Sequence, residues 1–330
     1  MQRRALLTQW TFTGMAVATL AFGPQPLLGQ SAKKLKLATK LRIVIPAGNF
    51  GPLNEFGRSV GDALVGMGLC DEVDYDNKEG KGGAAGLAYF VDKHSSDANS
   101  LFVADTSLVG ALSLYKAGVD LARVSPIARL TSDALVVVVA ANSSIKSIAQ
   151  LVERMRTSPK QNPIGIAQVG GVEHVFAGLL AKSATSKADD NSYLPIARGF
   201  EMNDALLAGK IVAAISGYST FAADLTSGKL RALGVSTKRA AYGIASVREQ
   251  GQDVDTSNWR AVFTGQAIGA GRQADMVEAM KIAVTYELWK KTLRQNNWDS
   301  AWLSGADLTR FIDIESKTTQ LMVQLLKLKA

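Results

Sequence analysis

The sequence predicts an α/β protein built from two domains, and three observations lead to this expectation. The chain has 330 residues, which exceeds the usual size of one domain and suits two. Short β-branched and apolar runs alternate with segments of helical period, and glycine-bearing turns separate them. Two apolar strands, residues 134–140 and 261–264, stand where the chain can pass between domains and return.

The first domain is expected to open with three strand–turn–helix units. Residues 41–45 (LRIVI) form a buried strand because of their β-branched composition, and Pro46 ends it. Asp105, Thr106 and Ser107 follow the third strand and offer side-chain oxygens suited to an N-cap. The expected strands are 41–45, 73–75 and 101–104; the expected helices run over 54–66, from the glycine cluster at 80–86 to Val91, and from the N-cap to Tyr115.

A similar set of elements follows and predicts the second domain. Its expected strands are 134–140, 164–167, 211–215 and 230–235, and its expected helices are 147–155, 173–184 and 204–208. Residues 261–264 open the return, and two helices, 274–294 (broken) and 306–328, close the chain. The alternation predicts two parallel sheets. We expect a discontinuous first domain of residues 41–136 with 266–330, and a second domain of residues 137–265.

The first 30 residues are typical of an export signal, with a linker to about residue 40. Arg3 and Arg4 lie in a short basic segment, which admits a twin-arginine route. Residues 10–23 are an uncharged apolar run, too short to cross a hydrocarbon core of about 30 Å as a helix. Pro24 and Pro26 end that run. The mature protein is therefore expected outside the cytoplasm.

Charge and motif content exclude several classes of function. The formal charge is +8, or +6 without Arg3 and Arg4, but lysines and arginines are scattered, so no nucleic-acid partner is expected. The single cysteine, Cys70, excludes an intramolecular disulfide. The two histidines, His94 and His174, are far apart in sequence, and no Cys/His cluster predicts a metal. We find no nucleophile elbow, phosphate loop or dinucleotide fingerprint, so no cofactor is expected.

Four stretches resemble one known family. They are LRIVIP at 41–46, the G-x-x-x-H turn at 170–174, SGKLRALGV at 227–235 and EQG at 249–251. In their order and spacing the chain resembles, over about residues 41–330, the periplasmic solute receptors of tripartite tricarboxylate transporters, the Bug-type proteins.

The resemblance implies a fold and a function. The fold is a two-lobed periplasmic-binding-protein architecture, type II-like, with two α/β domains joined by two crossing segments. The function is capture of a small organic carboxylate in the interdomain cleft, as a Venus flytrap, without catalysis. It further implies a periplasmic monomer that delivers its ligand to the membrane permease subunits of a tripartite transporter.

Helix N-termini at the carboxyl ends of strands are the expected ligand site. Their unpaired N–H groups and positive dipole ends suit a carboxylate, and glycine lets the backbone approach it. The expected ligand-binding residues are Ala47, Gly48, Asn49, Phe50, Gly51, Asn54, Asp105, Thr106, Ser107, Gln168, Val169, Gly170, Gly171, Gly199, Gly217 and Tyr218.

Some of these positions depart from the family's pattern or admit a plainer interpretation. Asn54 stands where the family usually has an acid, which argues against a ligand held by an ammonium group. Gly171 replaces a hydroxyl residue and Gln168 a glycine. Asn54 fits a helix cap as well as a ligand contact, and Phe50 fits a plug of the cleft as well as a stacking surface.

Other residues and other functions stay open. Arg198 can serve an anion or simply face solvent, and His174 suits a structural role. Two other functions remain: a sensory or orphan binding protein that passes its ligand to a signalling partner, and a secreted hydrolytic enzyme that uses Ser107 with His174 as base.

Overall fold

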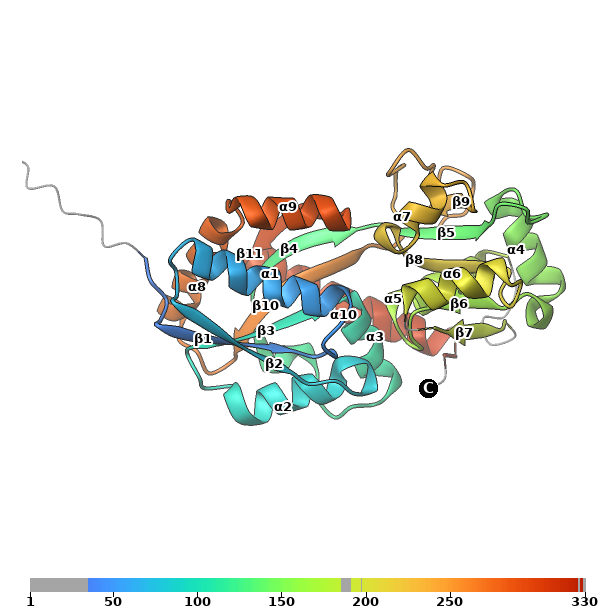
Figure 1. Cartoon of the computed structure of the whole chain (residues 1–330). Helices are drawn as coiled ribbons and strands as arrows, with labels where there is room; N and C mark the ends of the chain where they lie inside the picture. Colours follow the sequence, from blue (N-terminus) through green and yellow to red (C-terminus); the bar gives the residue numbers. More distant parts are fainter. Residues whose placement is uncertain (1–34, 185–190, 197, 326, 329–330) are drawn as a thin grey trace, which may run out of the picture. The chain divides into compact units, whose positions relative to one another are not determined.

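Two mixed β-sheets organise the chain in the computed structural model, which describes residues 35–184, 191–196, 198–325 and 327–328. The predicted export signal lies outside these residues. The first sheet has the order β11-β4-β10-β3-β1-β2 and the second β7-β6-β8-β5-β9 (Figure 1). Their strands are β1 Lys40–Ile45, β2 Glu72–Asn77, β3 Ser100–Asp105, β4 Val124–Asp133, β5 Leu135–Ala140, β6 Ile164–Ile166, β7 Tyr193–Pro195, β8 Ala213–Gly217, β9 Leu230–Val235, β10 Asn258–Gly265 and β11 Asp299–Ser304.

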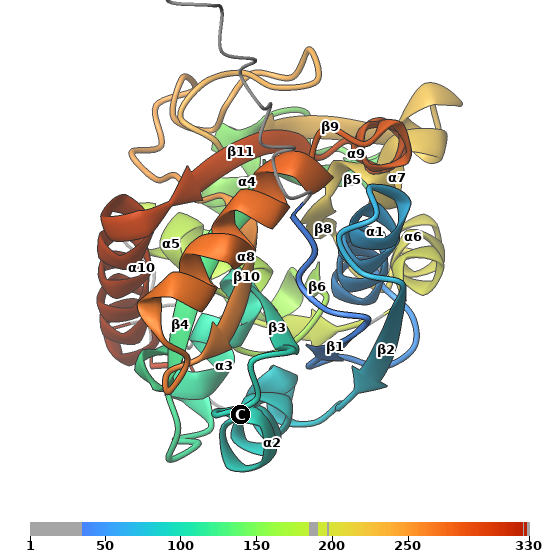
Figure 2. The same ribbon diagram turned by 90° about the vertical axis from the view of Figure 1, so that its left-hand side faces the viewer.

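Helices pack on both faces of each sheet, and we call a sheet with its helices a lobe. In the first lobe α1 and α8 lie on one side of the sheet, and α2, α3 and α10 on the other (Figure 2). In the second lobe, α4 and α5 face α6 and α7 across the sheet. The helices are α1 Pro52–Gly66, α2 Ala84–His94, α3 Thr106–Leu114, α4 Ile148–Thr157, α5 Val172–Ser183, α6 Gly199–Leu207, α7 Tyr218–Thr226, α8 Ala270–Ala283, α9 Glu287–Asn296 and α10 Gly305–Leu325, with short 3-10 turns at Lys81–Gly83, Leu121–Arg123 and Pro159–Gln161.

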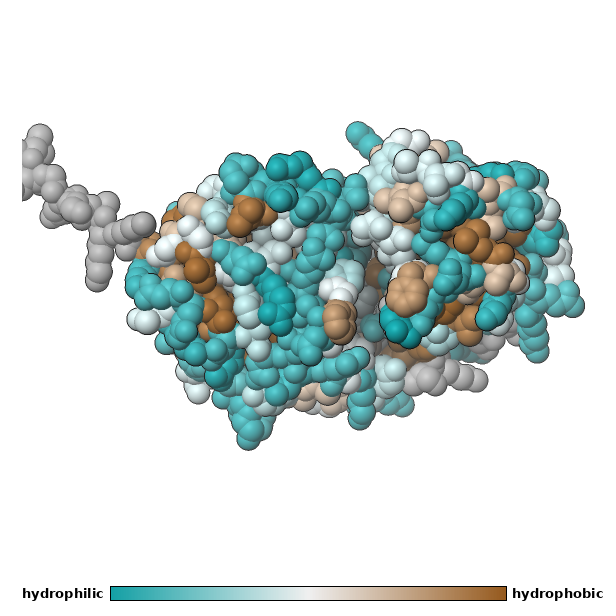
Figure 3. Space-filling model, in the orientation of Figure 1, coloured by the Kyte–Doolittle hydropathy of each residue, from teal (hydrophilic) through white to brown (hydrophobic). Residues whose placement is uncertain are grey.

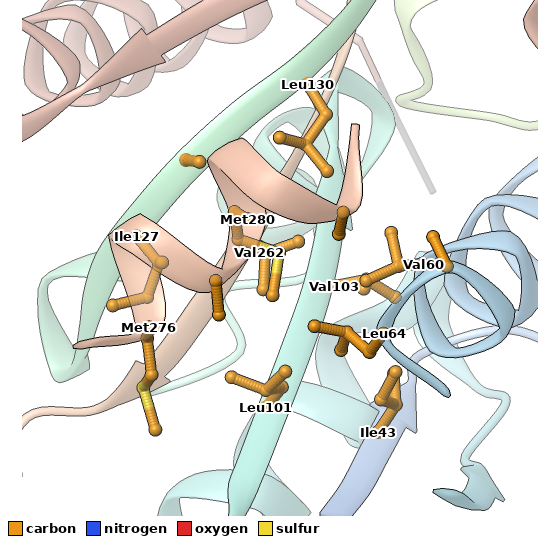
Figure 4. Packing of buried hydrophobic residues seen from close by; sticks show 14 of the residues in the cluster. Ile43, Val60, Leu64, Leu101, Val103, Ile127, Leu130, Val262, Met276 and Met280 are labelled. Atoms are coloured by element: carbon orange, nitrogen blue, oxygen red, sulfur yellow. The ribbon is translucent and has the colours of Figure 1, made fainter. Parts of the chain in front are cut away.

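The core of the first lobe shows why its apolar runs form these elements. Alternate residues of the central strands, such as Val103 and Val262, point to one face of the sheet (Figure 4). Leu64 of α1 and Met280 of α8 cover them at helical spacing. All four are fully buried, and each buried side chain of this size contributes about 1.5–3 kcal/mol relative to exposure.

The prediction of parallel sheets is wrong in part, because both sheets are mixed. β10 runs antiparallel to β3 and β4, and β5 runs antiparallel to β8 and β9. The reason is the direction of crossing. β3, β4, β8 and β9 run toward the junction of the lobes. β5 and β10 each enter a sheet from the other lobe, so they run away from the junction and pair antiparallel with these neighbours.

The chain changes sheet at two places. Only Ala134 separates β4 of the first sheet from β5 of the second, and the return lies between Val235 and Asn258. The division into domains at residues 41–136 with 266–330 and 137–265 stays a prediction. Within the part of the chain that is described, no helix combines the length and apolar content that membrane crossing requires.

Candidate ligand site between the two lobes

The N-terminal ends of α3 and α5 meet where the two lobes join. Figure 1 shows these helices side by side with α10, and Figure 3 shows the surface hollowed between the lobes on the face drawn. The Val172 N–H at the start of α5 donates to Ser107 Oγ at 3.5 Å. Two segments predicted to bind ligand, residues 105–107 and 168–171, are therefore brought together from different lobes.

Glycines make this approach possible. A Cβ added to Gly110 of α3 would lie only 2.0 Å from the carbonyl oxygen of Gly170, so no side chain fits there. Gly82, at φ +63°, also lies against the second lobe, since an added Cβ would be 3.3 Å from Gln168 Nε2. The backbone of the 168–171 turn thus rests directly on the first lobe.

The side chains that open α3 are held by protein partners. Asp105 is the N-cap, as predicted, and accepts from the Leu108 N–H at 3.1 Å. The Thr106 hydroxyl donates to the Ser257 carbonyl at 3.2 Å and accepts from the Trp259 N–H at 2.9 Å. These bonds fix α3 to β10, the strand that returns from the second lobe.

The first loop, residues 47–51, is fixed by a residue that sequence reasoning missed. Asn77, at the end of β2, donates from Nδ2 to the carbonyls of Ala47 and Gly48 and to Asn54 Oδ1, at 3.0, 2.9 and 3.0 Å. Asn54 Nδ2 in turn donates to the Asn49 carbonyl at 2.9 Å. Asn54 is not the helix cap, because Gly51 (φ +94°) holds that position, and its amide serves to shape the loop.

Exchange of Asn77 for aspartate should disorganise this loop. The isosteric change replaces a donor with a carboxylate facing three acceptors, so we expect a loss of about 1–3 kcal/mol in the free energy of unfolding. Urea denaturation measures it. Asn99→Asp is the matched surface change and should cost less than about 0.5 kcal/mol; equal losses in both variants would contradict the role given to Asn77.

Phe50 lies in this fixed loop with 90% of its surface exposed. Burial of a phenylalanine side chain would stabilise the protein by about 1.5–3 kcal/mol relative to this exposed position. The loop bonds hold it outside the core, which leaves its ring available to a ligand or to the other lobe.

A buried ion pair marks the point where both crossings pass. Arg260 of β10 and Asp133, the last residue of β4, are 2% and 4% exposed and bond through Arg260 Nη1 and Asp133 Oδ1. The guanidinium lies 4.4 Å over the Trp298 ring. The sequence pointed to Arg198 as a cation for an anionic ligand, but Arg198 is exposed and pairs with Glu201 at the start of α6. The available signal was a single arginine inside the apolar strand NWRAVF.

A second buried acid, Glu173, lies in the first turn of α5. Burial, reinforced by the charges of Asp105 and Asp133 and opposed by Arg260, raises its pKa to about 7. Burial likewise raises the pKa of Asp105 and of Asp133. Asp105, Asp133 and Glu173 therefore lie within electrostatic reach of one another and of the Arg260 guanidinium.

Two predicted residues, Gly217 and Tyr218, lie where α7 begins, beside Asp133 of the buried ion pair. Tyr218 stacks on Tyr242 with ring centroids 4.3 Å apart, and a Cβ on Gly217 would lie 3.4 Å from Asp133 Oδ2. The Tyr242 hydroxyl donates to the Asn297 carbonyl at 2.9 Å, which links the return segment to the end of α9. Gly199, by contrast, packs against Thr220 within the second lobe.

A cavity of about 310 Å³ lies where α3, α5 and α10 meet the return segment. Two predicted residues, Thr106 and Gly170, line it, together with Val172, Ser257 and Glu315. Its size is at the lower end of the range for small-molecule sites. The contribution of α10 was not predicted, because nothing in its sequence distinguishes this face.

His174 has the structural role that the sequence suggested. His174 is buried and accepts from the Gly170 N–H at 3.0 Å through Nδ1, and burial lowers its pKa to about 4. Ser107 and His174 thus bond to separate backbone N–H groups, of Val172 and Gly170, and the geometry does not support a nucleophile–base pair. Cys70 is buried, and burial raises the pKa of its thiol to about 11.

Comparisons with known proteins give the fold from solved structures and the family from a family model. A search of curated proteins found no match. A TctC solute-binding protein from Polaromonas, solved without ligand, is 19% identical with a TM-score of 0.71, over 87% of this chain and 98% of that one. MatC from Rhodopseudomonas palustris with bound malate is 16% identical with a TM-score of 0.72, over 87% and 99%. An R. palustris protein solved with adipate is 16% identical with a TM-score of 0.76, over 88% and 98%.

These structures show the two-lobed periplasmic-binding-protein fold that the sequence predicted. The family model described as "Tripartite tricarboxylate transporter family receptor" matches residues 60–328, which is most of the chain. The chain belongs to the receptor family of tripartite tricarboxylate transporters.

Proposed function

We propose that this protein is a periplasmic receptor that captures a small organic carboxylate between its lobes and delivers it to the permease subunits of a tripartite transporter. It binds its ligand without chemical change. The observation that carries the proposal is the meeting of the α3 and α5 N-termini at the junction of the lobes. Malate and adipate, bound in two structures of the same fold, are ligands of the proposed class.

Helix ends supply the binding chemistry. α1, α5 and α7 begin after Gly51, Gly171 and Gly217, and these N-cap glycines supply no capping side chain; at α5 the Val172 N–H donates to Ser107 Oγ of the first lobe. Unpaired N–H groups of a first helical turn and the positive dipole end attract a carboxylate. A ligand that accepts hydrogen bonds from helix N-termini of both lobes would link the two lobes.

A thermal-shift screen over mono-, di- and tricarboxylates tests the proposal. A ligand at 100 times its dissociation constant should stabilise the protein by about 2.7 kcal/mol. In the Gly171→Val variant the new side chain would crowd Gln168 and Glu173 at the N-terminus of α5. We expect no ligand-dependent rise in melting temperature for this variant. No stabilisation by any acid would contradict carboxylate capture, and a signalling role would show as ligand-dependent pull-down of a receptor and not of the permease.

A further inference from the structure

Glu173 is a buried acid at the end of α5 where the proposed function needs an anion to bind. It is 7% exposed, and within the described part of the chain its Oε2 has no hydrogen-bond partner. That oxygen lies beside the turn that opens α5, since a Cβ added to Gly171 would be 3.1 Å from it. An ionised carboxyl group here would repel a carboxylate ligand, and it would leave a buried charge without a donor.

The charged groups around Glu173 make this repulsion stronger. Asp105 at the start of α3 and Asp133 at the end of β4 both act on it, and Arg260 of β10 opposes them. If Glu173 is ionised, an anionic ligand joins three negative groups that are within electrostatic reach of a single guanidinium. A neutral Glu173 removes one of these negative charges at the point where the ligand binds.

Glu173 is also the acid whose protonation breaks no existing bond. Asp133 bonds to Arg260, and Asp105 accepts the Leu108 N–H at the start of α3. Glu173 Oε2 has no such partner, and burial together with the neighbouring acids raises the pKa of Glu173 to about 7. A proton on this oxygen turns a repelling acceptor into an O–H donor, and O–H groups form short, strong hydrogen bonds to carboxylates.

We propose that this receptor takes up one proton on Glu173 when it captures its carboxylate ligand, and that the protonated Glu173 donates a hydrogen bond to that ligand. The proton comes from solvent, and no covalent bond of the ligand forms or breaks. The inference rests on the proposed function and adds a regulation of the same site, because affinity falls as the pH rises. By linkage, the bound ligand in turn holds the proton on Glu173.

The affinity should follow the protonated fraction of Glu173 in the free receptor. A group with a pKa of about 7 is roughly three-quarters protonated at about pH 6.5 and only about 3% protonated at about pH 8.5, and the apparent affinity scales with the competent fraction. Binding should therefore be at least tenfold weaker at the higher pH. His174, with a pKa lowered to about 4, stays neutral throughout this range.

Isothermal calorimetry with succinate, malate and adipate at these two pH values tests the inference. Both carboxyl groups of each acid are ionised at both values, so a change in affinity reports on the protein. The wild-type protein should bind its best acid at least tenfold more tightly at the lower pH. At the higher pH, heats measured in buffers of different ionisation enthalpy should show uptake of close to one proton per ligand.

Glu173→Gln places a neutral N–H donor where the protonated acid has its O–H. This variant should bind the same acid with an affinity that differs less than threefold between the two pH values, and without proton uptake. Glu153→Gln is the control, because Glu153 is an exposed acid of the same lobe that pairs with Arg156. It should retain the pH dependence of the wild type.

A wild-type affinity that differs less than threefold between the two pH values would overturn the inference, whether or not Glu173→Gln folds. An undiminished pH dependence in a folded Glu173→Gln would overturn it as well, because another group would then carry the proton. Binding of none of the three acids at either pH by the wild-type protein would instead count against carboxylate capture itself.

Discussion

Alanine at position 110 is expected to lower ligand affinity at least tenfold by holding the lobes apart. The new Cβ would lie 2.0 Å from the Gly170 carbonyl oxygen, and this neighbour is backbone that cannot rotate away. Alanine favours a helix over glycine by about 1 kcal/mol, so α3 itself should not be weakened. The clash acts only across the junction.

Titration calorimetry with the best acid from the thermal-shift screen measures the loss, and small-angle scattering should show a less compact particle. Gly271→Ala in α8 is the control, because an added Cβ there meets nothing within 4 Å. It should bind as the wild type does and unfold at equal or higher urea. Wild-type affinity in Gly110→Ala would show that the α3–α5 contact is not needed for binding.

Arg260→Met is expected to lower the free energy of unfolding by about 3–5 kcal/mol. The change leaves Asp133 buried without its cation, and an uncompensated buried charge is strongly destabilising. It also removes the guanidinium from the Trp298 ring. Because Asp133 and Arg260 lie at the two crossings, the loss should appear as one cooperative shift in urea denaturation.

Arg248→Met is the matched control, since Arg248 forms ion pairs with Asp253 and Asp255 that are open to solvent. Exposed pairs contribute about 0–1 kcal/mol, and this variant should lose no more. The double variant Asp133→Leu with Arg260→Met should recover much of the loss, because no lone charge remains. A loss below about 1 kcal/mol in Arg260→Met would contradict the role given to the pair.

The elements with strong periodicity were predictable from sequence. The β-branched run of β1, the Asp105 cap of α3 and the break between α8 and α9 are all confirmed. Weakly patterned elements were missed. β11 (DSAWLS) is a half-buried edge strand without alternation, and α7 buries only Phe221, so neither shows a clear period.

The geometry of the site was less predictable, because it depends on contacts between residues distant in sequence. The parallel register that sets Ile45 opposite Asn77 brings the Asn77 amide under the first loop, and no local pattern indicates that register. Asp133 and Arg260 become partners only through the pairing of β4 and β10. Glu173 was read only as the start of a helix, since its burial follows from the contact between lobes.

Hydrogen–deuterium exchange with and without the best acid from the screen tests most directly whether a ligand is held between the lobes. We expect slower exchange in both residues 105–112 and residues 168–176, because the ends of α3 and α5 belong to different lobes and share one ligand. Residues 270–296 of α8 and α9 should exchange at the same rate in both samples. Protection confined to one lobe, or protection of α8 and α9 alone, would contradict the interlobe site.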